Sequence, residues 1–446
     1  MQNRNFFLLG ALSVLFIATG CSRVENLFDS EDKAPLPGER ISVLELQSTL
    51  EPDDIALETQ GLVSPAPWKN EFWPQAGGYP NHSMQNLELG SGALKPAWSA
   101  DIGEGSSGDL PLTSQPILVD GRVFTLDTTS QLTAFNAKTG KQLWRTDVRD
   151  LSEDDPVISG GIAFSGGLIY VTNGYNELLT VKPADGKINW RKRIAAPSRA
   201  APTIMGERVF VTTLDNRLLA LNANDGSLLW EYAGLSESAG LVGAASAAAS
   251  NDVVLPVFSS GEITALRVEN GSVAWSDNLA NIKPTGGLAS LADIKALPVL
   301  DKGLVIAISF SGRLAAIEER SGNRIWQREI GGSDTPWLAG NHLFVITLDS
   351  ELVALGRDTG AIRWVTKLPR YENPEKRRDE IAWAGPLLAG GRLLAFSSNG
   401  LMAEIDPENG KILRQTETDR AVRISPIVAG GMLYVLSEDG TLTAYK

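Results

Sequence analysis

Short apolar runs separated by turn residues recur along most of the chain, and residues Ala201–Trp230 show one complete unit. Its four runs, each alternating or wholly apolar, are Thr203–Met205, Val209–Thr213, Leu218–Asn222 and Ser227–Trp230. Pairs or triplets rich in Gly, Asn and Asp separate these runs. Gly and Asn adopt positive φ at little cost and therefore close tight hairpins between antiparallel strands. The pattern predicts a four-stranded antiparallel meander.

The unit recurs in a fixed register, in which a Gly of the third turn is followed four residues later by a Trp. The six copies are Gly140/Trp144, Gly186/Trp190, Gly226/Trp230, Gly271/Trp275, Gly322/Trp326 and Gly360/Trp364. A seventh copy has Gly410 but Arg414 in place of the Trp, and an eighth begins at Pro426 and reaches Lys446 without a fourth strand. Upstream, Trp98 ends an apolar run with no repeat in front of it. That run is expected to supply the missing strand.

These copies predict an all-β fold, an eight-bladed β-propeller of four-stranded antiparallel blades over residues 68–446. The ring closes when the N-terminal strand completes the last blade, because both open edges are then paired. First strands should begin near Pro116, Gly161, Pro202, Ala245, Leu297, Pro336, Pro386 and Pro426. Fourth strands should end at Trp98, Trp144, Trp190, Trp230, Trp275, Trp326, Trp364 and Arg414.

The first twenty residues are interpreted as a lipoprotein signal peptide. Arg4 precedes the apolar run Phe6–Ile17, and small residues lead to Cys21, the only cysteine. This arrangement resembles a lipobox, in which the Cys thiol carries the lipid anchor; the alternative is a plain signal peptide with an incidental Cys. Ser22 after the Cys matches sorting to the outer membrane.

Residues 21–67 are acidic and contain prolines, which predicts a solvated tether. Within it, Ile41–Leu46 is apolar enough to dock on the propeller or to pair with a partner's strand. Trp68, Phe72, Trp73 and Tyr79 then form an aromatic entry segment. We expect this segment to cover one face of the ring.

The charge and the rare residue types narrow the function. A formal net charge of −13 argues against nucleic acid as the main partner. The two histidines, His82 and His342, are far apart in sequence, which disfavours a metal or catalytic pair. The Gly pairs fit hairpin turns rather than a phosphate loop. The basic run at residues 376–378 is flanked by carboxylates, which is typical of a solvated loop. We therefore predict no catalytic residue, metal or cofactor.

Three long inserts are the best places to look for a binding surface, because loops vary while blade cores cannot. They are Ala233–Ala249, Leu279–Ala296 and Leu368–Ala384. Each joins an outer strand to the inner strand of the next blade, so all three should emerge on the same face of the ring.

The repeat, as in Phe135–Trp144, resembles that of quinoprotein alcohol dehydrogenases. The lipobox, the eight blades and the segments Phe72–Gly78, Leu291–Ile294 and Asp334–Trp337 together resemble the BamB family, lipoproteins of the outer-membrane β-barrel assembly (BAM) machinery. The loop Pro374–Arg378 fits the alphaproteobacterial branch of that family. This resemblance extends over nearly the whole chain.

The resemblance implies a non-enzymatic scaffold, anchored in the outer membrane through Cys21 and facing the periplasm, that assists the folding and insertion of β-barrel proteins. Its implied partners are the periplasmic modules of BamA and the other BAM subunits; direct contact with unfolded outer-membrane proteins is left open. The family's docking positions map onto the loops before the fourth and fifth blades. There Leu241 and Asp293 match the family's apolar and acidic residues, whereas Val242 replaces an arginine and Lys295 replaces a second aspartate.

Two alternatives remain. One is an envelope propeller that binds a different protein or a cell-wall partner. The other is a quinoprotein dehydrogenase, which in many members needs an adjacent Cys pair beside the quinone and a Ca²⁺ site of oxygen ligands. A chain with one Cys cannot supply that pair.

Overall fold

The computed structural model describes residues 50–53, 63–150, 152, 155–237, 241, 243–280 and 292–446. Cys21, the segment Ile41–Leu46 and Val242 lie outside these residues. Residues Leu50–Lys446 form one compact unit. Within the described ranges, no helix is long and apolar enough to cross a membrane.

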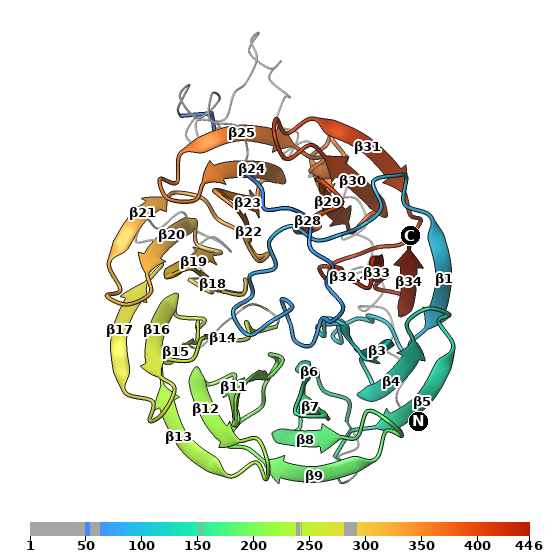
Figure 1. Cartoon of the computed structure of the whole chain (residues 1–446), viewed down its shortest axis with the longest axis vertical. Helices are drawn as coiled ribbons and strands as arrows, with labels where there is room; N and C mark the ends of the chain where they lie inside the picture. The colour runs from blue at the N-terminus through green and yellow to red at the C-terminus, as the bar shows by residue number, and fades with distance from the viewer. Residues whose placement is uncertain are drawn as a thin grey trace, which may run out of the picture. The chain divides into compact units, whose positions relative to one another are not determined.

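Eight four-stranded antiparallel sheets are arranged in a ring (Figure 1). Blade 1 consists of β2(Ile117–Val119), β3(Arg122–Leu126), β4(Gln131–Asn136) and β5(Gln142–Asp147), and blade 2 of β6(Gly161–Ser165), β7(Leu168–Asn173), β8(Glu177–Val181) and β9(Ile188–Arg193). Blade 3 consists of β10(Thr203–Met205), β11(Arg208–Thr212), β12(Arg217–Asn222) and β13(Leu228–Ala233), and blade 4 of β14(Ala248–Ala249), β15(Val253–Leu255), β16(Glu262–Arg267) and β17(Val273–Asn278). The predicted fold, an eight-bladed propeller, is confirmed.

Blades 5 to 8 continue the ring in chain order. Blade 5 consists of β18(Val299–Asp301), β19(Leu304–Ser309), β20(Arg313–Glu318) and β21(Arg324–Arg328), and blade 6 of β22(Trp337–Ala339), β23(His342–Ile346), β24(Glu351–Gly356) and β25(Ile362–Lys367). Blade 7 consists of β28(Trp383–Ala389), β29(Arg392–Ser397), β30(Leu401–Ile405) and β31(Ile412–Glu417). Blade 8 consists of β32(Ile427–Ala429), β33(Met432–Leu436), β34(Thr441–Tyr445) and the N-terminal strand β1(Pro96–Asp101). A separate hairpin, β26(Tyr371–Asn373) and β27(Arg378–Glu380), lies between blades 6 and 7.

The fourth strands continue past the residues at which they were predicted to end. In blade 3, β13 runs to Ala233, three residues beyond Trp230. Trp230 pairs with Ala220 and Leu228 pairs with Leu221, so Leu229 is the extra residue of a β-bulge. The same register shift precedes Trp98, every other fourth-strand Trp, and Arg414. A bulge bends the outer strand and increases its twist, which turns the Trp toward the next blade.

The ring closes where the two ends of the propeller meet. Strand β1 pairs with β34, so that Trp98 faces Ala444, and reciprocal backbone bonds join Lys95 to Lys446. At the junction between blades 7 and 8, Glu404 accepts from Arg414 at 3.0 Å and forms an ion pair with buried Arg392 at 2.6 Å. Arg392 also donates to the carbonyls of Gly90 and Gly92, just before β1. This buried network holds the closing strand in place.

The aromatic entry segment, residues 68–90, makes a full circuit inside the ring. It bonds in chain order to the inner strands of all eight blades. The partners are Asn70 with Val428, Trp73 with Leu118, Pro74 with Phe164, Gln75 with Ile204, Pro80 with Ala249, Asn81 with Leu300, Gln85 with Trp337 and Leu87 with Leu388. We call residues 68–90 the inner circuit; it is the chain that crosses the centre of Figure 1.

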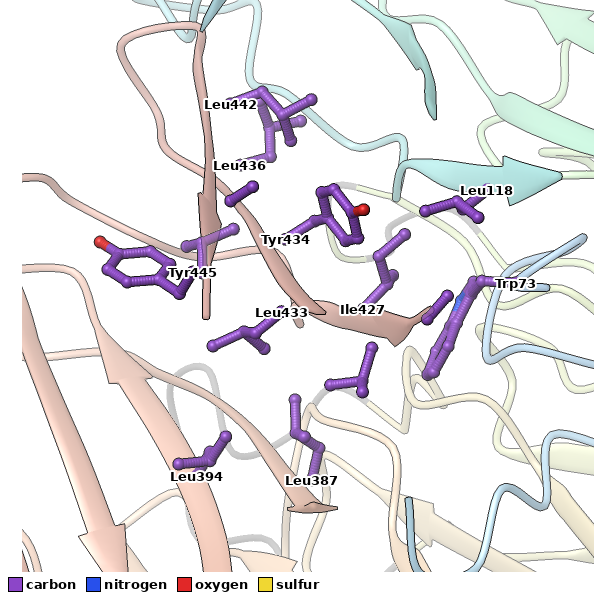
Figure 2. Close-up of a cluster of buried hydrophobic side chains, with 14 of the residues drawn as sticks. Trp73, Leu118, Leu387, Leu394, Ile427, Leu433, Tyr434, Leu436, Leu442 and Tyr445 are labelled. Carbon is purple, nitrogen blue, oxygen red and sulfur yellow. The ribbon is translucent and has the colours of Figure 1, made fainter. Parts of the chain in front are cut away.

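The core is divided among the blade junctions, and the inner circuit contributes to it. Trp73, 1% exposed, packs with Leu118 of blade 1 and Ile427 of blade 8 (Figure 2). Leu87 is fully buried in the same cluster. An aromatic side chain of this size buries about 150–250 Å². The circuit is thus part of the core rather than a cover laid on it.

Two pieces of the range assigned to the tether pack against blades 5 and 6. Asp53 forms an ion pair with Arg328, and its backbone N–H donates to the Ile362 carbonyl at 3.1 Å. Val63 accepts from the backbone N–H of Asn341 at 3.3 Å. Part of residues 21–67 therefore belongs to the compact unit.

Candidate functional site

We call the side of the ring that carries the connections between successive blades the loop face. A meander of four strands places all of these connections on one side, because each fourth strand ends where the next first strand begins. The described parts of the three long inserts belong to it. The third insert forms the β26–β27 hairpin, whose basic turn at residues 376–378 is exposed. The loops before blades 4 and 5 hold the predicted docking residues.

Leu241 and Asp293 come from two different loops and are in direct contact. The Leu241 backbone N–H donates to the Asp293 carboxylate at 2.5 Å. Asp293 is only 7% exposed, and burial raises the pKa of its carboxyl group, while the bond from Leu241 and the positive charge of Lys295 lower it. The bond joins Leu241, from the loop before blade 4, to Asp293, from the loop before blade 5.

This contact changes what each predicted residue can do. Leu241 is partly buried and Lys295 is exposed, so both side chains reach the loop face. Asp293 is turned inward, where its charge holds Leu241 rather than facing a partner. The sequence gives no sign of this orientation, because a loop aspartate is usually exposed and no neighbouring residue in the sequence marks this one as buried.

A small hollow of about 200 Å³ lies beside Leu241, between blades 3 and 4. Its apolar wall includes Leu214, Val257 and Phe258, and Leu214 is 40% exposed. Arg199, from the loop before blade 3, lines the same hollow. Sequence reasoning missed Leu214 and Arg199, because neither belongs to a motif and only the ring brings them beside Leu241.

A larger hollow of about 500 Å³ opens at the centre of the loop face. Ala76 of the inner circuit contributes to its lining. Lys295 and Asp334 lie on its wall, and burial raises the pKa of Asp334 to about 6 against the opposing charge of Lys295. The two hollows share Arg199, Gly243 and Ala244 in their lining and therefore lie next to each other.

The histidines are separated in the fold as well as in the sequence. His82 contacts the Pro298 carbonyl at 2.7 Å through Nδ1, and burial lowers its pKa to about 4. His342 contacts Asn341 and Arg363 in blade 6. Within the part of the chain that the structure describes, no group of three or more His, Cys, Asp or Glu side chains is placed to hold a metal ion.

The fourth strands are bulged, and their Trp side chains dock on the next blade. These features place the protein among the eight-bladed β-propellers built from quinoprotein-like repeats. The sequence profile of the family described as outer membrane protein assembly factor BamB matches residues 90–164, 149–366 and 372–446. The chain belongs to this BamB family. Outer membrane protein assembly factor BamB of Yersinia pestis is 24% identical over 451 residues, covering 100% of both chains.

Solved structures give the same fold. BamB from Moraxella catarrhalis has a TM-score of 0.68 at 21% identity, covering 79% of this chain and 100% of that chain. Quinohemoprotein alcohol dehydrogenase from Comamonas testosteroni has a TM-score of 0.62 at 13% identity, covering 84% and 80%. At these identities the likeness shows the propeller architecture alone, which hosts both assembly factors and enzymes.

Proposed function

We propose that this protein is a non-enzymatic scaffold of outer-membrane protein assembly that binds a periplasmic module of BamA through its loop face. The observation that carries the proposal is the contact between Leu241 and Asp293, which holds the Leu241 backbone so that an apolar side chain lies at the edge of a hollow. Pre-organised apolar anchors beside pockets are the usual energetic centres of protein interfaces. Membership of the BamB family supports the choice of partner.

The proposal includes the attachment and the location of the protein. A lipid on Cys21 anchors it to the outer membrane, and the tether lets the loop face reach BamA in the periplasm. The other BAM subunits are further partners of the same assembly. No cofactor or metal takes part.

The direct test is binding to the purified periplasmic region of BamA by calorimetry or pull-down. Leu241→Arg places an unpaired charge at the centre of the proposed contact and should weaken binding by about tenfold or more. Leu228→Arg is the matched control, because Leu228 is 54% exposed on the outer strand of blade 3, away from the loop face. Equal affinities for wild type and Leu241→Arg would place the interface elsewhere.

Val242→Arg is the companion variant, because it restores the residue that the resemblance places at this position. A gain in affinity is expected if the partner has kept an acidic group there, and a loss is expected if the partner has changed together with Val242. Either result identifies the chemistry that faces this loop.

The quinoprotein likeness in fold makes dehydrogenase activity the second candidate. Its test is the absorbance of bound quinone after addition of pyrroloquinoline quinone and Ca²⁺. We expect no bound quinone; stoichiometric binding with alcohol oxidation would replace the scaffold proposal.

A further inference from the structure

Arg199 is a charged residue of the loop face whose guanidinium group has no bonded partner among the described residues. Its side chain is partly buried and lines both hollows, yet no hydrogen bond or ion pair joins its guanidinium group to another described residue. The protein as a whole is acidic, with a formal net charge of −13, so carboxylates are in excess. An arginine that has no carboxylate partner among the described residues is available to a ligand.

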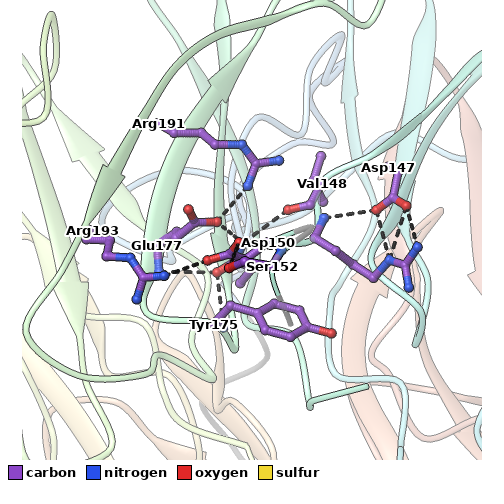
Figure 3. A network of polar contacts seen from close by, with 10 residues as sticks. Asp147, Val148, Asp150, Ser152, Tyr175, Glu177, Arg191 and Arg193 are labelled. Carbon is purple, nitrogen blue, oxygen red and sulfur yellow. Dashed lines mark hydrogen bonds and ion pairs between the residues drawn. The ribbon is translucent and has the colours of Figure 1, made fainter. Parts of the chain in front are cut away.

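Neighbouring arginines, by contrast, are paired with carboxylates. Arg193 forms an ion pair with Asp150 at 2.7 Å, and Arg191 forms one with Glu177 at 2.6 Å (Figure 3). Arg149 contacts both carboxylate oxygens of Asp147. The Arg193–Asp150 pair joins the end of β9 to the loop between blades 1 and 2. Arg199, in contrast, lines the hollows with no ion pair to any residue in the described ranges.

The backbone on both sides of Arg199 is firmly held. Ser198 is fully buried and donates to the Thr212 carbonyl at 2.7 Å, while Thr172 donates to the Ala200 carbonyl at 2.6 Å. The Pro197 carbonyl accepts from Leu214 at 2.9 Å. Because the main chain is fixed by two blades, the guanidinium group can bind a ligand at little cost in backbone ordering.

The shape of the surface indicates what kind of ligand fits. The saddle between the hollows is made by Arg199, Gly243 and Ala244, and the last two have little or no side chain. A main chain lying across this saddle would pass beside the guanidinium group. It would also direct one side chain into the small hollow, against Leu214 and Phe258.

We propose that Arg199 is a specificity residue of the loop face, which binds a carboxylate on an extended segment of the partner while the adjacent apolar side chain of that segment enters the small hollow. The planar guanidinium group suits this role because it binds carboxylates through two parallel hydrogen bonds. The inference rests on the proposed function, since it takes the partner to be the BamA periplasmic region. It adds the chemistry by which that partner is selected.

The test compares Arg199→Gln with wild type for binding to the purified BamA periplasmic region at low and at physiological salt. Affinity should fall about tenfold, and the salt dependence of the remaining binding should become shallower. Arg199→Lys keeps the charge but loses the two-pronged geometry and should give an intermediate affinity. Arg193→Gln is the matched control, since it removes the same charge from an arginine already paired with Asp150.

The outcomes separate the two proposals. Wild-type affinity and salt dependence in Arg199→Gln, together with lost binding in Leu241→Arg, would overturn the role of Arg199 and leave the partner in place. Binding that neither variant changes would overturn the proposed docking face, and absence of binding by the wild-type protein would overturn both. A fall in affinity without a change in salt dependence would also reject a carboxylate as the ligand.

Discussion

The indole ring of Trp98 lies against Gly140, although the repeat pairs Gly140 with Trp144 in sequence. A Cβ added to Gly140 would come within 2.5 Å of the Trp98 ring, and the Trp98 Nε1 donates to the Ala137 carbonyl at 3.0 Å. The same relationship joins each Trp to the Gly of the next blade. The pairs are Trp144/Gly186, Trp190/Gly226, Trp230/Gly271, Trp275/Gly322, Trp326/Gly360 and Trp364/Gly410. Gly and Trp within one unit therefore serve two successive junctions.

This relationship predicts a difference between two glycines of blade 1. Gly140 and Gly121 both have φ of +69°, but a Cβ on Gly121 would meet nothing within 4 Å. Gly121→Ala should cost about 1–2 kcal/mol from left-handed strain alone, and Gly140→Ala about 1–3 kcal/mol more from displacement of Trp98. Chemical denaturation measures both values. Equal losses would mean that the Trp98 ring moves aside freely.

The exception at Arg414 predicts that restoring the repeat is harmful. Blade 8 takes its fourth strand from β1, so the continuous third turn that would receive a Trp from blade 7 does not exist there. Arg414→Trp should lower the free energy of unfolding by about 1 kcal/mol through loss of its bond to Glu404. Glu404→Ala should cost about 3–5 kcal/mol, because it leaves buried Arg392 without its carboxylate. A stabilised Arg414→Trp variant would contradict this account.

Asp334 predicts a pH-dependent penalty on stability. Burial raises its pKa from 3.8 to about 6 in the folded protein, so the native state binds more protons than the unfolded state between these values. The contribution of Asp334 to stability therefore falls as pH rises from about 4 to 6. Asp334→Asn removes the charge and should raise the free energy of unfolding at pH 7.5 by up to about 3 kcal/mol, but not at pH 4. Thermal unfolding at the two pH values measures the difference as a higher melting temperature at pH 7.5 only. The same gain at both pH values would exclude titration of Asp334 as the cause.

The lipid anchor is tested by Cys21→Ser. The variant lacks the proposed thiol for lipid attachment and should remain as an uncleaved precursor or be found in the soluble fraction after extraction. Fractionation and mass spectrometry of the N-terminus distinguish these products from the lipidated protein. Processing and outer-membrane attachment like those of the wild type would reject the lipobox.

The ring was predictable because its signal is repeated. Each Gly and Trp that closes a turn or docks a blade occurs once per unit, and a missing strand at one end matches a surplus strand at the other. The bulge before each Trp was not predicted, since an extra residue in a strand does not alter the apolar pattern enough to be read.

The candidate site was only partly predictable. Leu241 and Asp293 were chosen through a family resemblance, and the structure adds that Asp293 holds Leu241 instead of facing outward. Arg199 and Leu214 carry no motif, because their place beside Leu241 depends on the packing of blades 3 and 4. Function here depends on neighbours distant in sequence, which a single sequence does not reveal.

The inner circuit has a consequence for how the protein is made. Residues 68–90 precede all the blades along the chain, yet their backbone partners extend as far as Gly430 in the last one. During export these residues emerge early and must wait, unpaired, until nearly the entire remaining chain has followed. Contacts of such large sequence separation form slowly, so completion of the native ring is a late step. Once formed, loss of one blade junction leaves the circuit still bonded to the other blades, and we expect the domain to unfold as a single unit.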